Sequence, residues 1–227
     1  MRERPRIIAL IPARDEAPTV GATVDALRGF ADQVVVVDDG SSDGTGSLAL
    51  QAGATVLRIP GHAGKGAAIE GALLRLPPHP GVWLFADADL GASAAGLAAL
   101  LPPVVSGHVD MTVALFPAST GGGLGTVKRL SGAGIKALSG FRADEPLSGQ
   151  RAMSAACLAA VRPIAGGFGM ETAMTIDAAR AGMRIAELPV EGLTHRATGR
   201  GVSGFTHRGR EGLHIVVALA ARAVGLR

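Results

Sequence analysis

The fold is decided by residues 82–90, which read Val-Trp-Leu-Phe-Ala-Asp-Ala-Asp-Leu. The first half is a short apolar run, typical of a strand that is buried on both faces of a sheet. The second half places Asp87 and Asp89 just past the expected end of that strand, and in open α/β sheets ligands bind at the carboxyl ends of the strands. Alternate residues of an extended chain point the same way, so we expect both carboxylates to face one hard cation, Mg²⁺ or Mn²⁺. The stretch therefore predicts a divalent-cation site that could hold a nucleoside diphosphate.

The composition is that of a chain with a large aliphatic core. Hydrophobic residues make up 48% of the 227 residues, while Tyr is absent and Trp occurs once, so the core must consist of Ala, Val, Leu and Ile. The single cysteine, Cys157, excludes an internal disulfide, fits a reducing compartment and lies among small apolar residues that favour a buried position. No apolar segment approaches the roughly 18 residues of a membrane span, which predicts a cytoplasmic protein.

The formal charge of +3 is unevenly distributed along the chain. A basic run between residues 196 and 210 contains no acidic residue and includes His207 and the arginines at positions 196, 200, 208 and 210. Such a run is typical of either a solvated face or a phosphate-binding segment. Few aromatic residues accompany these charges, so nucleic-acid binding is not expected.

Apolar strands and amphipathic helices alternate through the first half of the chain. Strands are expected over residues 6–11, 34–37, 54–59, 82–86 and 109–115, with helices over 19–30, 43–52, 66–76 and 94–105. Helices between apolar strands indicate right-handed βαβ crossovers, and hence an α/β fold with a mostly parallel central sheet flanked by helices.

This regularity ends after Phe116. A glycine-rich loop that could move is expected over 117–126, followed by helices over 127–138, 154–161 and 171–181 and strands over 147–153 and 184–190. An apolar last helix is expected over 209–224, which either covers the sheet or lies in a membrane interface beside the basic run. The chain contains no repeat and no linker. We therefore expect one domain over 1–227, with a nucleotide-binding half (1–116), an acceptor half (117–211) and a C-terminal apolar helix (212–227).

A second candidate site follows the strand at residues 34–37. This β-branched run ends in Asp38 and Asp39 and leads through a glycine-containing turn into a helix. The acids either accept hydrogen bonds from a base or ribose, or Asp38 and Ser42 serve as turn and N-cap residues. Lys65, between two glycines before another helix, is either a phosphate ligand or an ordinary surface lysine. The stretch over 34–45 is not a Gly-x-Gly-x-x-Gly fingerprint, and no P-loop occurs.

Taken in order, these motifs resemble the family 2 glycosyltransferases, which have the Rossmann-like GT-A fold. The segments that carry the resemblance are Ile11–Glu16 (IPARDE), Val37–Thr45 (VDDGSSDGT), Gly64–Gly66 (GKG) and Asp87–Asp89 (DAD). The chain looks most like the dolichyl- or polyprenyl-phosphate mannosyl- and glucosyltransferases, through Glu145–Ala152 (EPLSGQRA), Glu171, Glu187–Val190 (ELPV) and Arg196–Gly199 (RATG). That branch usually has Arg-x-x-Gly-x-Ser-Lys at the last segment, and the lysine is missing here.

The resemblance implies a donor site, a metal site and a catalytic centre. The donor-binding residues would be Pro12, Ala13, Arg14, Glu16, Asp38, Asp39, Lys65, Asp87, Ala88, Asp89, Gln150, Arg196 and Arg200. Asp39 would contact the base, and Gln150 and Arg151 would face the diphosphate or the acceptor. Asp87, Asp89 and His195 would hold Mg²⁺ or Mn²⁺, and Asp89, Arg151 and Glu171 would form the catalytic set. Glu171 is either the general base or a helix-start carboxylate stabilised by the helix dipole.

The implied activity is metal-dependent transfer of a hexose, with inversion, from a nucleoside-diphosphate sugar. A UDP-sugar is favoured and GDP-mannose is left open; the acceptor is a polyprenyl phosphate or a small hydroxylated molecule such as a glycerate derivative. One alternative is a nucleotidyltransferase that makes the nucleotide sugar, although such enzymes carry a Gly-rich, Lys-bearing loop where residues 12–16 read PARDE. Another is a non-catalytic module that binds nucleotide sugars. Peripheral contact of the C-terminal helix with the inner face of the membrane and a homodimer are left open.

Overall fold

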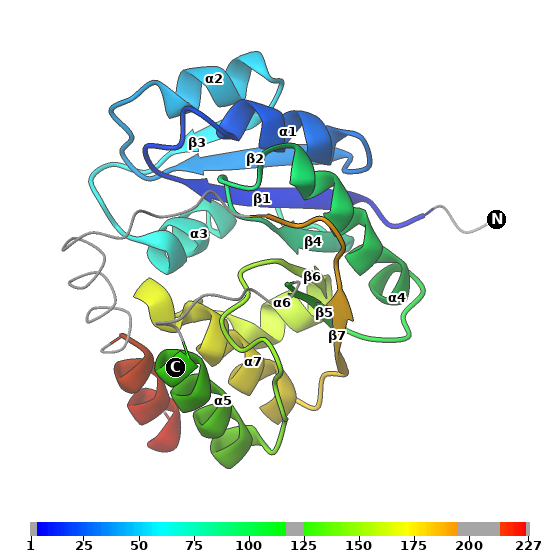
Figure 1. Cartoon of the computed structure of the whole chain (residues 1–227), viewed down its shortest axis with the longest axis vertical. Coiled ribbons are helices and arrows are strands. Elements are labelled where there is room, and N and C mark those ends of the chain that lie inside the picture. Colours follow the sequence, from blue (N-terminus) through cyan, green and yellow to red (C-terminus); the bar gives the residue numbers. More distant parts are fainter. Residues whose placement is uncertain (1–3, 117–124, 195–213, 226–227) are drawn as a thin grey trace.

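One seven-stranded mixed sheet organises the chain (Figure 1). The computed structural model describes residues 4–116, 125–194 and 214–225. The strands lie in the order β3-β2-β1-β4-β6-β5-β7. Their bounds are β1 (Ile7–Ala13), β2 (Gln33–Asp38), β3 (Thr55–Arg58), β4 (Val82–Phe85), β5 (Met111–Leu115), β6 (Arg151–Ser154) and β7 (Ile185–Pro189).

The helices lie close to where the sequence predicts them. They are α1 (Val20–Arg28), α2 (Thr45–Gln51), α3 (Lys65–Leu73), the 3₁₀ helix η1 (Gly91–Leu100), α4 (Leu101–Val105), α5 (Gly125–Ser139), α6 (Ala155–Val161), the 3₁₀ helix η2 (Gly167–Gly169) and α7 (Met170–Arg180). A last helix spans residues 214–223.

The single helix expected over 94–105 is divided in two. Pro102 and Pro103 cannot donate a backbone hydrogen bond, so an α-helix tolerates them only in its first turn. The α-helix accordingly begins at Leu101, and the residues before it form η1.

The expectation of a mostly parallel sheet is confirmed, with one exception. β1 pairs in parallel with β2 and β4, β2 with β3, and β5 with β7. β6 runs antiparallel to both of its neighbours, β4 and β5. The amino end of β6 therefore lies at the carboxyl end of β4, with Phe85 opposite Arg151. The strand expected over 147–153 begins only at Arg151, so the residues just before it are free to approach the end of β4.

Side chains of the central strands alternate between two cores, one on each face of the sheet. Ile7, Ala9 and Ile11 of β1 belong to the core under α1, α2, η1 and α4. Ile8 and Leu10 belong to the core under α3, α6 and α7. Figure 1 shows α1 and α2 on one face of β1–β3 and α3 on the other.

The expected burial of the cysteine is confirmed in the second core. Cys157 of α6 is fully buried and free of any disulfide. Burial raises the pKa of its thiol to about 12, so the group is neutral at physiological pH.

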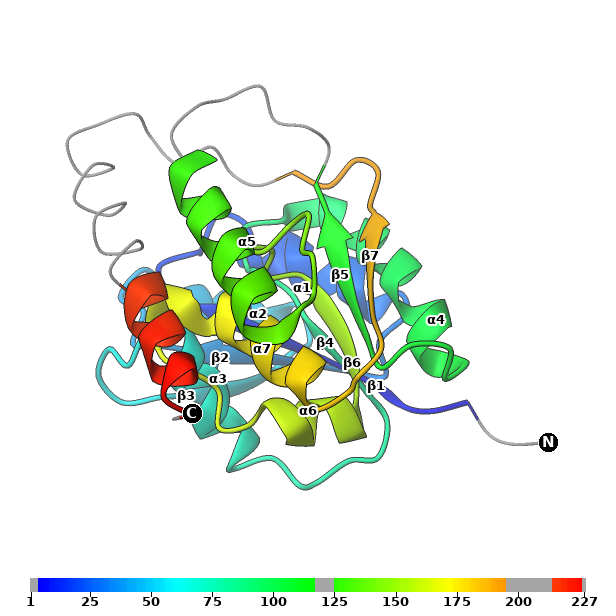
Figure 2. The same cartoon turned by 90° about the horizontal axis from the view of Figure 1, so that it is seen from below.

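The last helix packs beside α5 and α7 (Figures 1 and 2). Ile215 and Ala218 are buried, and a Cβ placed on Gly134 of α5 would strike the side chain of Leu219, which explains a glycine inside α5. Packing against the fold is thus confirmed for one face of this helix, while Val216 and Val217 remain exposed. Contact with a membrane interface stays a prediction. Within the described ranges no helix has the length and apolar character needed to cross a bilayer.

A buried ion pair joins the last helix to α7. Nη2 of Arg222 lies 2.7 Å from Oδ2 of Asp177, and both side chains are only 4% exposed. Arg180 of α7 also donates from its guanidinium to the carbonyl oxygen of Arg222, at 2.8 Å.

Removing one partner of this pair should be strongly destabilising. Asp177→Ala leaves the Arg222 guanidinium buried and unpaired, so we expect the free energy of unfolding to fall by about 3–5 kcal/mol. Replacing both residues by apolar ones, Asp177→Leu with Arg222→Met, should recover most of that loss. Urea unfolding measures both variants, with the exposed Asp25→Ala on α1 as a control expected to change little. A double variant no more stable than Asp177→Ala would contradict the expectation.

Candidate functional site

Two carboxylates and a lysine meet at the carboxyl end of β4. Asp87 lies two residues past the end of β4, Lys65 is the first residue of α3, and Glu171 lies in the first turn of α7. Nζ of Lys65 is 2.7 Å from Oδ1 of Asp87 and 2.8 Å from Oε1 of Glu171. The structure thus brings together three residues that the sequence singled out separately.

Its surroundings favour the positively charged form of Lys65. Burial, the largest influence, lowers the pKa of Lys65, but the carboxylates of Asp87 and then Glu171 together outweigh it and raise that pKa above its usual value. The lysine side chain is 29% exposed and that of Glu171 only 8%. One ammonium therefore pairs with two carboxylates.

The side chain of Gln150 also holds Asp87 in place. Its Oε1 accepts a hydrogen bond from the backbone N–H of Asp87 at 2.9 Å, and its Nε2 donates to Oδ2 of Asp87 at 2.6 Å. Gln150 is completely buried. The sequence led us to expect Gln150 on a ligand; the structure instead places its amide on Asp87.

The turn after β4 is anchored to α1 by a residue that the sequence gave no reason to select. The hydroxyl of buried Thr23 donates to the carbonyl oxygen of Ala88 at 2.9 Å and accepts from the N–H of Gly91 at 2.8 Å. Ala88 is buried, whereas Asp87 and Asp89 on either side of it are partly exposed. This alternation agrees with two carboxylates directed away from the core, although their joint approach to one cation stays a prediction.

The donor set fits a hard divalent cation. Mg²⁺ is usually held by one or two carboxylates together with substrate phosphates and water, and Asp87 and Asp89 can supply the protein's share. Across residues 4–116, 125–194 and 214–225, no three His, Cys, Asp or Glu side chains are grouped as a metal site. The third expected ligand, His195, lies outside the described residues, as do Arg196, Arg200 and the rest of the basic run.

The guanidinium of Arg151 makes its hydrogen bonds inside the fold. Its side chain is fully buried; Nε donates to the carbonyl oxygen of Ser148 and Nη1 to the hydroxyl of Thr175, both at 2.9 Å. Since β6 is central in the sheet, a side chain at its first residue enters the core rather than a cleft. Burial also lowers the pKa of Arg151. Arg151 therefore joins β6 to α7, and its contact with a diphosphate or an acceptor stays a prediction.

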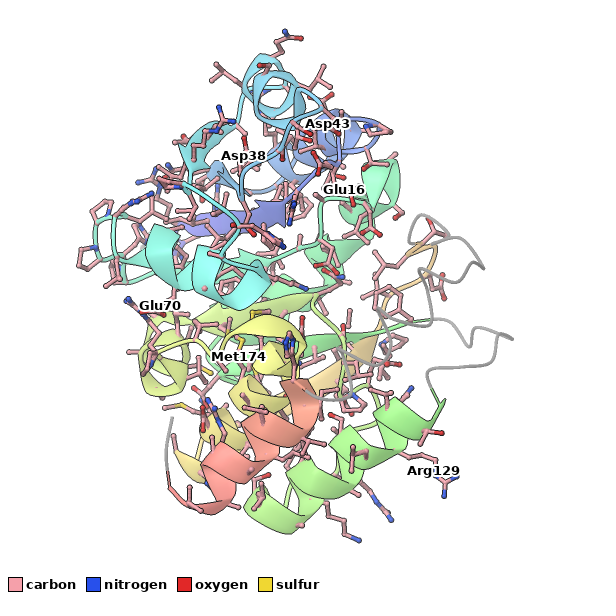
Figure 3. All side chains as sticks on the ribbon, turned by 90° about the vertical axis from the view of Figure 1, so that its left-hand side faces the viewer. Glu16, Asp38, Asp43, Glu70, Arg129 and Met174 are labelled. Carbon is pink, nitrogen blue, oxygen red and sulfur yellow. The ribbon has the colours of Figure 1, made fainter. Side chains whose placement is uncertain are left out.

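The second motif forms the neighbouring part of the same edge. Asp38 is buried and accepts from the N–H of Ser41 at 2.8 Å, which confirms its interpretation as a turn residue. Ser42 is not an N-cap: Gly44 precedes α2, and the hydroxyl of Ser42 donates to Asp15. Figure 3 shows Glu16, Asp38 and Asp43 gathered at this end of the molecule.

Asp39 holds the loop that leads into α3. Its two carboxylate oxygens accept from the N–H groups of Ala63 and Gly64 at 2.8 and 2.9 Å, and Nδ1 of His62 lies 3.1 Å away. The carboxylate thereby fixes the residues just before Lys65. A contact between Asp39 and a nucleotide base stays a prediction.

The loop after β1 is joined to the second motif. The N–H of Glu16 donates to the hydroxyl of Thr45 at 2.8 Å, and the N–H of Ala17 donates to Asp43 at 3.0 Å. The expected donor residues Pro12, Ala13 and Arg14 precede this junction, at the carboxyl end of β1. Their contact with a nucleotide likewise stays a prediction.

The segment before α7 is held against α3. Glu70 of α3 accepts from Arg162 at 2.7 Å and from the N–H of Ile164 at 3.0 Å, and Figure 3 shows Glu70 between α3 and the end of α6. A Cβ on Gly66 would collide with the carbonyl oxygen of Ala165, so only glycine allows this close approach. The same helix therefore supplies Lys65 and positions the segment that leads to Glu171.

Two cavities adjoin this edge of the sheet. One, of about 630 Å³, lies between residues 62–64, residues 163–167 and the last helix. The other, of about 390 Å³, is lined by Asp38, Ser41, Arg58 and residues of α2. The Asp87–Lys65–Glu171 cluster lines neither cavity, but Gly64, which precedes Lys65 in the chain, lines the larger one.

Comparison with known proteins finds related sequences. The model of glycosyl transferase family 2 matches residues 8–161. Glycosyltransferase AglJ of Haloferax volcanii is 30% identical over 189 residues, which cover 81% of this chain and 61% of that protein. Glucosyl-3-phosphoglycerate synthase of Mycolicibacterium paratuberculosis is 27% identical over 197 residues, covering 75% of this chain and 59% of that protein. The chain thus spans about three fifths of the length of these curated relatives.

Solved structures show the same fold. Glucosyl-3-phosphoglycerate synthase from Mycobacterium tuberculosis, in complex with Mn²⁺, UDP and phosphoglyceric acid, superposes with a TM-score of 0.80 at 25% identity. The match covers 98% of this chain and 80% of that one. The same enzyme in complex with Mg²⁺ and UDP also gives a TM-score of 0.80. The expected GT-A fold is thereby confirmed.

Removing the charge of Lys65 should destabilise the fold, because Glu171 loses its ion-pair partner. Lys65→Met leaves Glu171 buried without its ammonium, so we expect the free energy of unfolding to fall by about 1–3 kcal/mol. Lys136→Met, an exposed lysine on α5, should change it little. In urea unfolding, adding Glu171→Gln to Lys65→Met should cost less than the sum of the two single changes, because the pair is coupled. Strict additivity would show that the contact carries no energy.

Proposed function

Because the chain belongs to glycosyltransferase family 2, we propose that it transfers glucose from UDP-glucose to the hydroxyl group of a small phosphorylated acid, of which 3-phosphoglycerate is the model. One observation carries the proposal: Asp87, Lys65 and Glu171 meet at the carboxyl end of β4. One carboxylate can hold a cation that binds a diphosphate, and a charged ammonium can pair with the diphosphate oxygens. The other carboxylate can deprotonate a hydroxyl group. The relatives named glucosyl-3-phosphoglycerate synthase support the choice of donor and acceptor.

The donor would lie along the carboxyl ends of β1, β2 and β4. Asp87 and Asp89 would hold Mg²⁺ or Mn²⁺, which when bound neutralises the charge that develops on a leaving diphosphate. Lys65 would add a second positive charge near the same oxygens, since its ammonium is held at this edge by the two carboxylates. The segments around Glu16 and Asp39 would frame the nucleoside.

Glu171 would act as the general base. The acceptor hydroxyl gives its proton to the Glu171 carboxylate while its oxygen forms a bond to C1 of glucose; the bond from C1 to the β-phosphate oxygen breaks, and UDP leaves with that electron pair. Inversion at C1 follows from a single displacement. A phosphate acceptor is already ionised and would need no base, so a buried carboxylate at this position favours a hydroxyl acceptor over a polyprenyl phosphate.

The substrate assignment has a direct test. With UDP-glucose, 3-phosphoglycerate and Mn²⁺, we expect mass spectrometry to detect a glucosylated acceptor and an equal amount of UDP, and EDTA should reduce both to background. Polyprenyl phosphate and GDP-mannose serve as alternative acceptor and donor. UTP with glucose 1-phosphate should release no pyrophosphate. Product in the pyrophosphate reaction alone would favour the nucleotidyltransferase alternative.

The role of Glu171 is tested by removing its charge. Glu171→Gln should lower kcat by about 10²–10⁴-fold, because the base no longer accepts a proton. The affinity for UDP in the presence of Mn²⁺, measured by calorimetry, should stay close to that of the unaltered protein. Glu191→Gln, an exposed carboxylate after β7, is the matched control. Near-normal transfer by Glu171→Gln would leave Glu171 a helix-start carboxylate and not the base.

A further inference from the structure

Asp87 is held on a framework that comes from the antiparallel strand next to it. Because β6 runs opposite to β4, with Phe85 facing Arg151, the residues before Arg151 pass alongside the residues after Phe85. The carbonyl oxygen of Gln150 accepts from the N–H of Ala114 in β5 at 3.0 Å. The backbone of Gln150 is thus tied to the sheet, and its fully buried side chain has little freedom to move.

The amide of Gln150 makes two reciprocal hydrogen bonds to one residue. It accepts from the backbone N–H of Asp87 and donates to Oδ2 of the Asp87 carboxylate. Together these bonds close a ring that fixes both the main chain and the side-chain torsions of Asp87. A methionine of similar size would make neither bond, and a glutamate would place a second carboxylate 2.6 Å from the first.

The two oxygens of the Asp87 carboxylate therefore meet different partners. Oδ2 accepts a hydrogen bond from a neutral amide, whose own backbone is hydrogen-bonded to β5. Oδ1 forms an ion pair with the ammonium of Lys65, at the end of a flexible side chain. An arriving cation competes electrostatically with Lys65, which can move to a phosphate oxygen. It does not compete with Gln150, whose amide carries no charge.

Space around this arrangement is limited. A Cβ on Gly149 would lie 2.5 Å from Nζ of Lys65 and 3.0 Å from Oδ2 of Asp87, so a side chain at that position would push the pair apart. In the segment before β6, Gln150 thus supplies an amide to Asp87, and Gly149 leaves room for Asp87 and Lys65 because it has no side chain.

We infer that Gln150 is a positioning residue that holds the Asp87 carboxylate ready for the divalent cation. The inference rests on the proposed function, since it takes Asp87 as a cation ligand. Residues that orient metal ligands through hydrogen bonds typically change metal affinity by about 10–100-fold when they are replaced.

The test measures Mn²⁺ binding directly, by electron paramagnetic resonance of the free ion in the presence of UDP. For Gln150→Met we expect the dissociation constant of Mn²⁺ to rise by about 10–100-fold. Binding of UDP in EDTA should match that of the unaltered protein, because the nucleoside segments around Glu16 and Asp39 are untouched. Ser148→Ala is the matched control: within the described residues its buried hydroxyl has no hydrogen-bond partner, and it lies two positions from Gln150.

If Gln150→Met does not fold, Gln150→Asn provides the same test. The shorter amide cannot span both the N–H and the carboxylate of Asp87, so we expect Mn²⁺ affinity to fall here too. Mn²⁺ affinities of the folded variants within twofold of the unaltered protein would overturn the role of Gln150 and leave the proposed function standing. If the unaltered protein binds UDP but no Mn²⁺, the proposed cation site falls, and the role of Gln150 with it.

Discussion

The contact of one ammonium with two carboxylates is the interaction around which the site is built. Lys65, Asp87 and Glu171 come from α3, the end of β4 and α7, and they meet at distances of 2.7 and 2.8 Å. Each of the three is held by its own support. Asp39 fixes the loop before Lys65, Gln150 fixes Asp87, and Glu70 fixes the segment before α7. A partly buried charge cluster needs such supports because an unpaired member would be costly.

The mixed direction of the sheet explains how these supports converge. In a fully parallel sheet, the carboxyl end of β4 would be flanked only by the carboxyl ends of its neighbours. The antiparallel β6 instead brings its amino end there, and with it Gly149 and Gln150. Helices on both faces of the sheet also contribute. On one face α1 supplies Thr23 to the turn after β4, and on the other α3 and α7 supply Lys65 and Glu171.

Much of the fold could be predicted from the sequence because its strands and helices are marked by apolar periodicity and by glycines. The direction of β6 could not, since alternation of apolar residues in a four-residue strand carries no information on which neighbour it pairs with. For the site, the motifs identified Lys65, Asp87 and Glu171 but not their contacts. The motif gives only the order of Gln150 and Arg151 in the chain, and both were therefore expected to contact a ligand. Their burial depends on the central position of β6 in the sheet, which the motif does not show. Thr23 carried no signal, as a threonine on the apolar face of a helix is common. The single-domain interpretation stays a prediction.

The central claim is that the Asp87 carboxylate binds a divalent cation together with the diphosphate of a UDP-sugar. The most direct measurement is a crystal of the protein grown with Mn²⁺ and UDP, examined by anomalous diffraction at the manganese edge. The account predicts an anomalous peak bonded to an oxygen of Asp87 and to the diphosphate, with the Gln150 amide still on Asp87. UDP bound at this edge with no manganese beside Asp87, or manganese bound elsewhere, would contradict it.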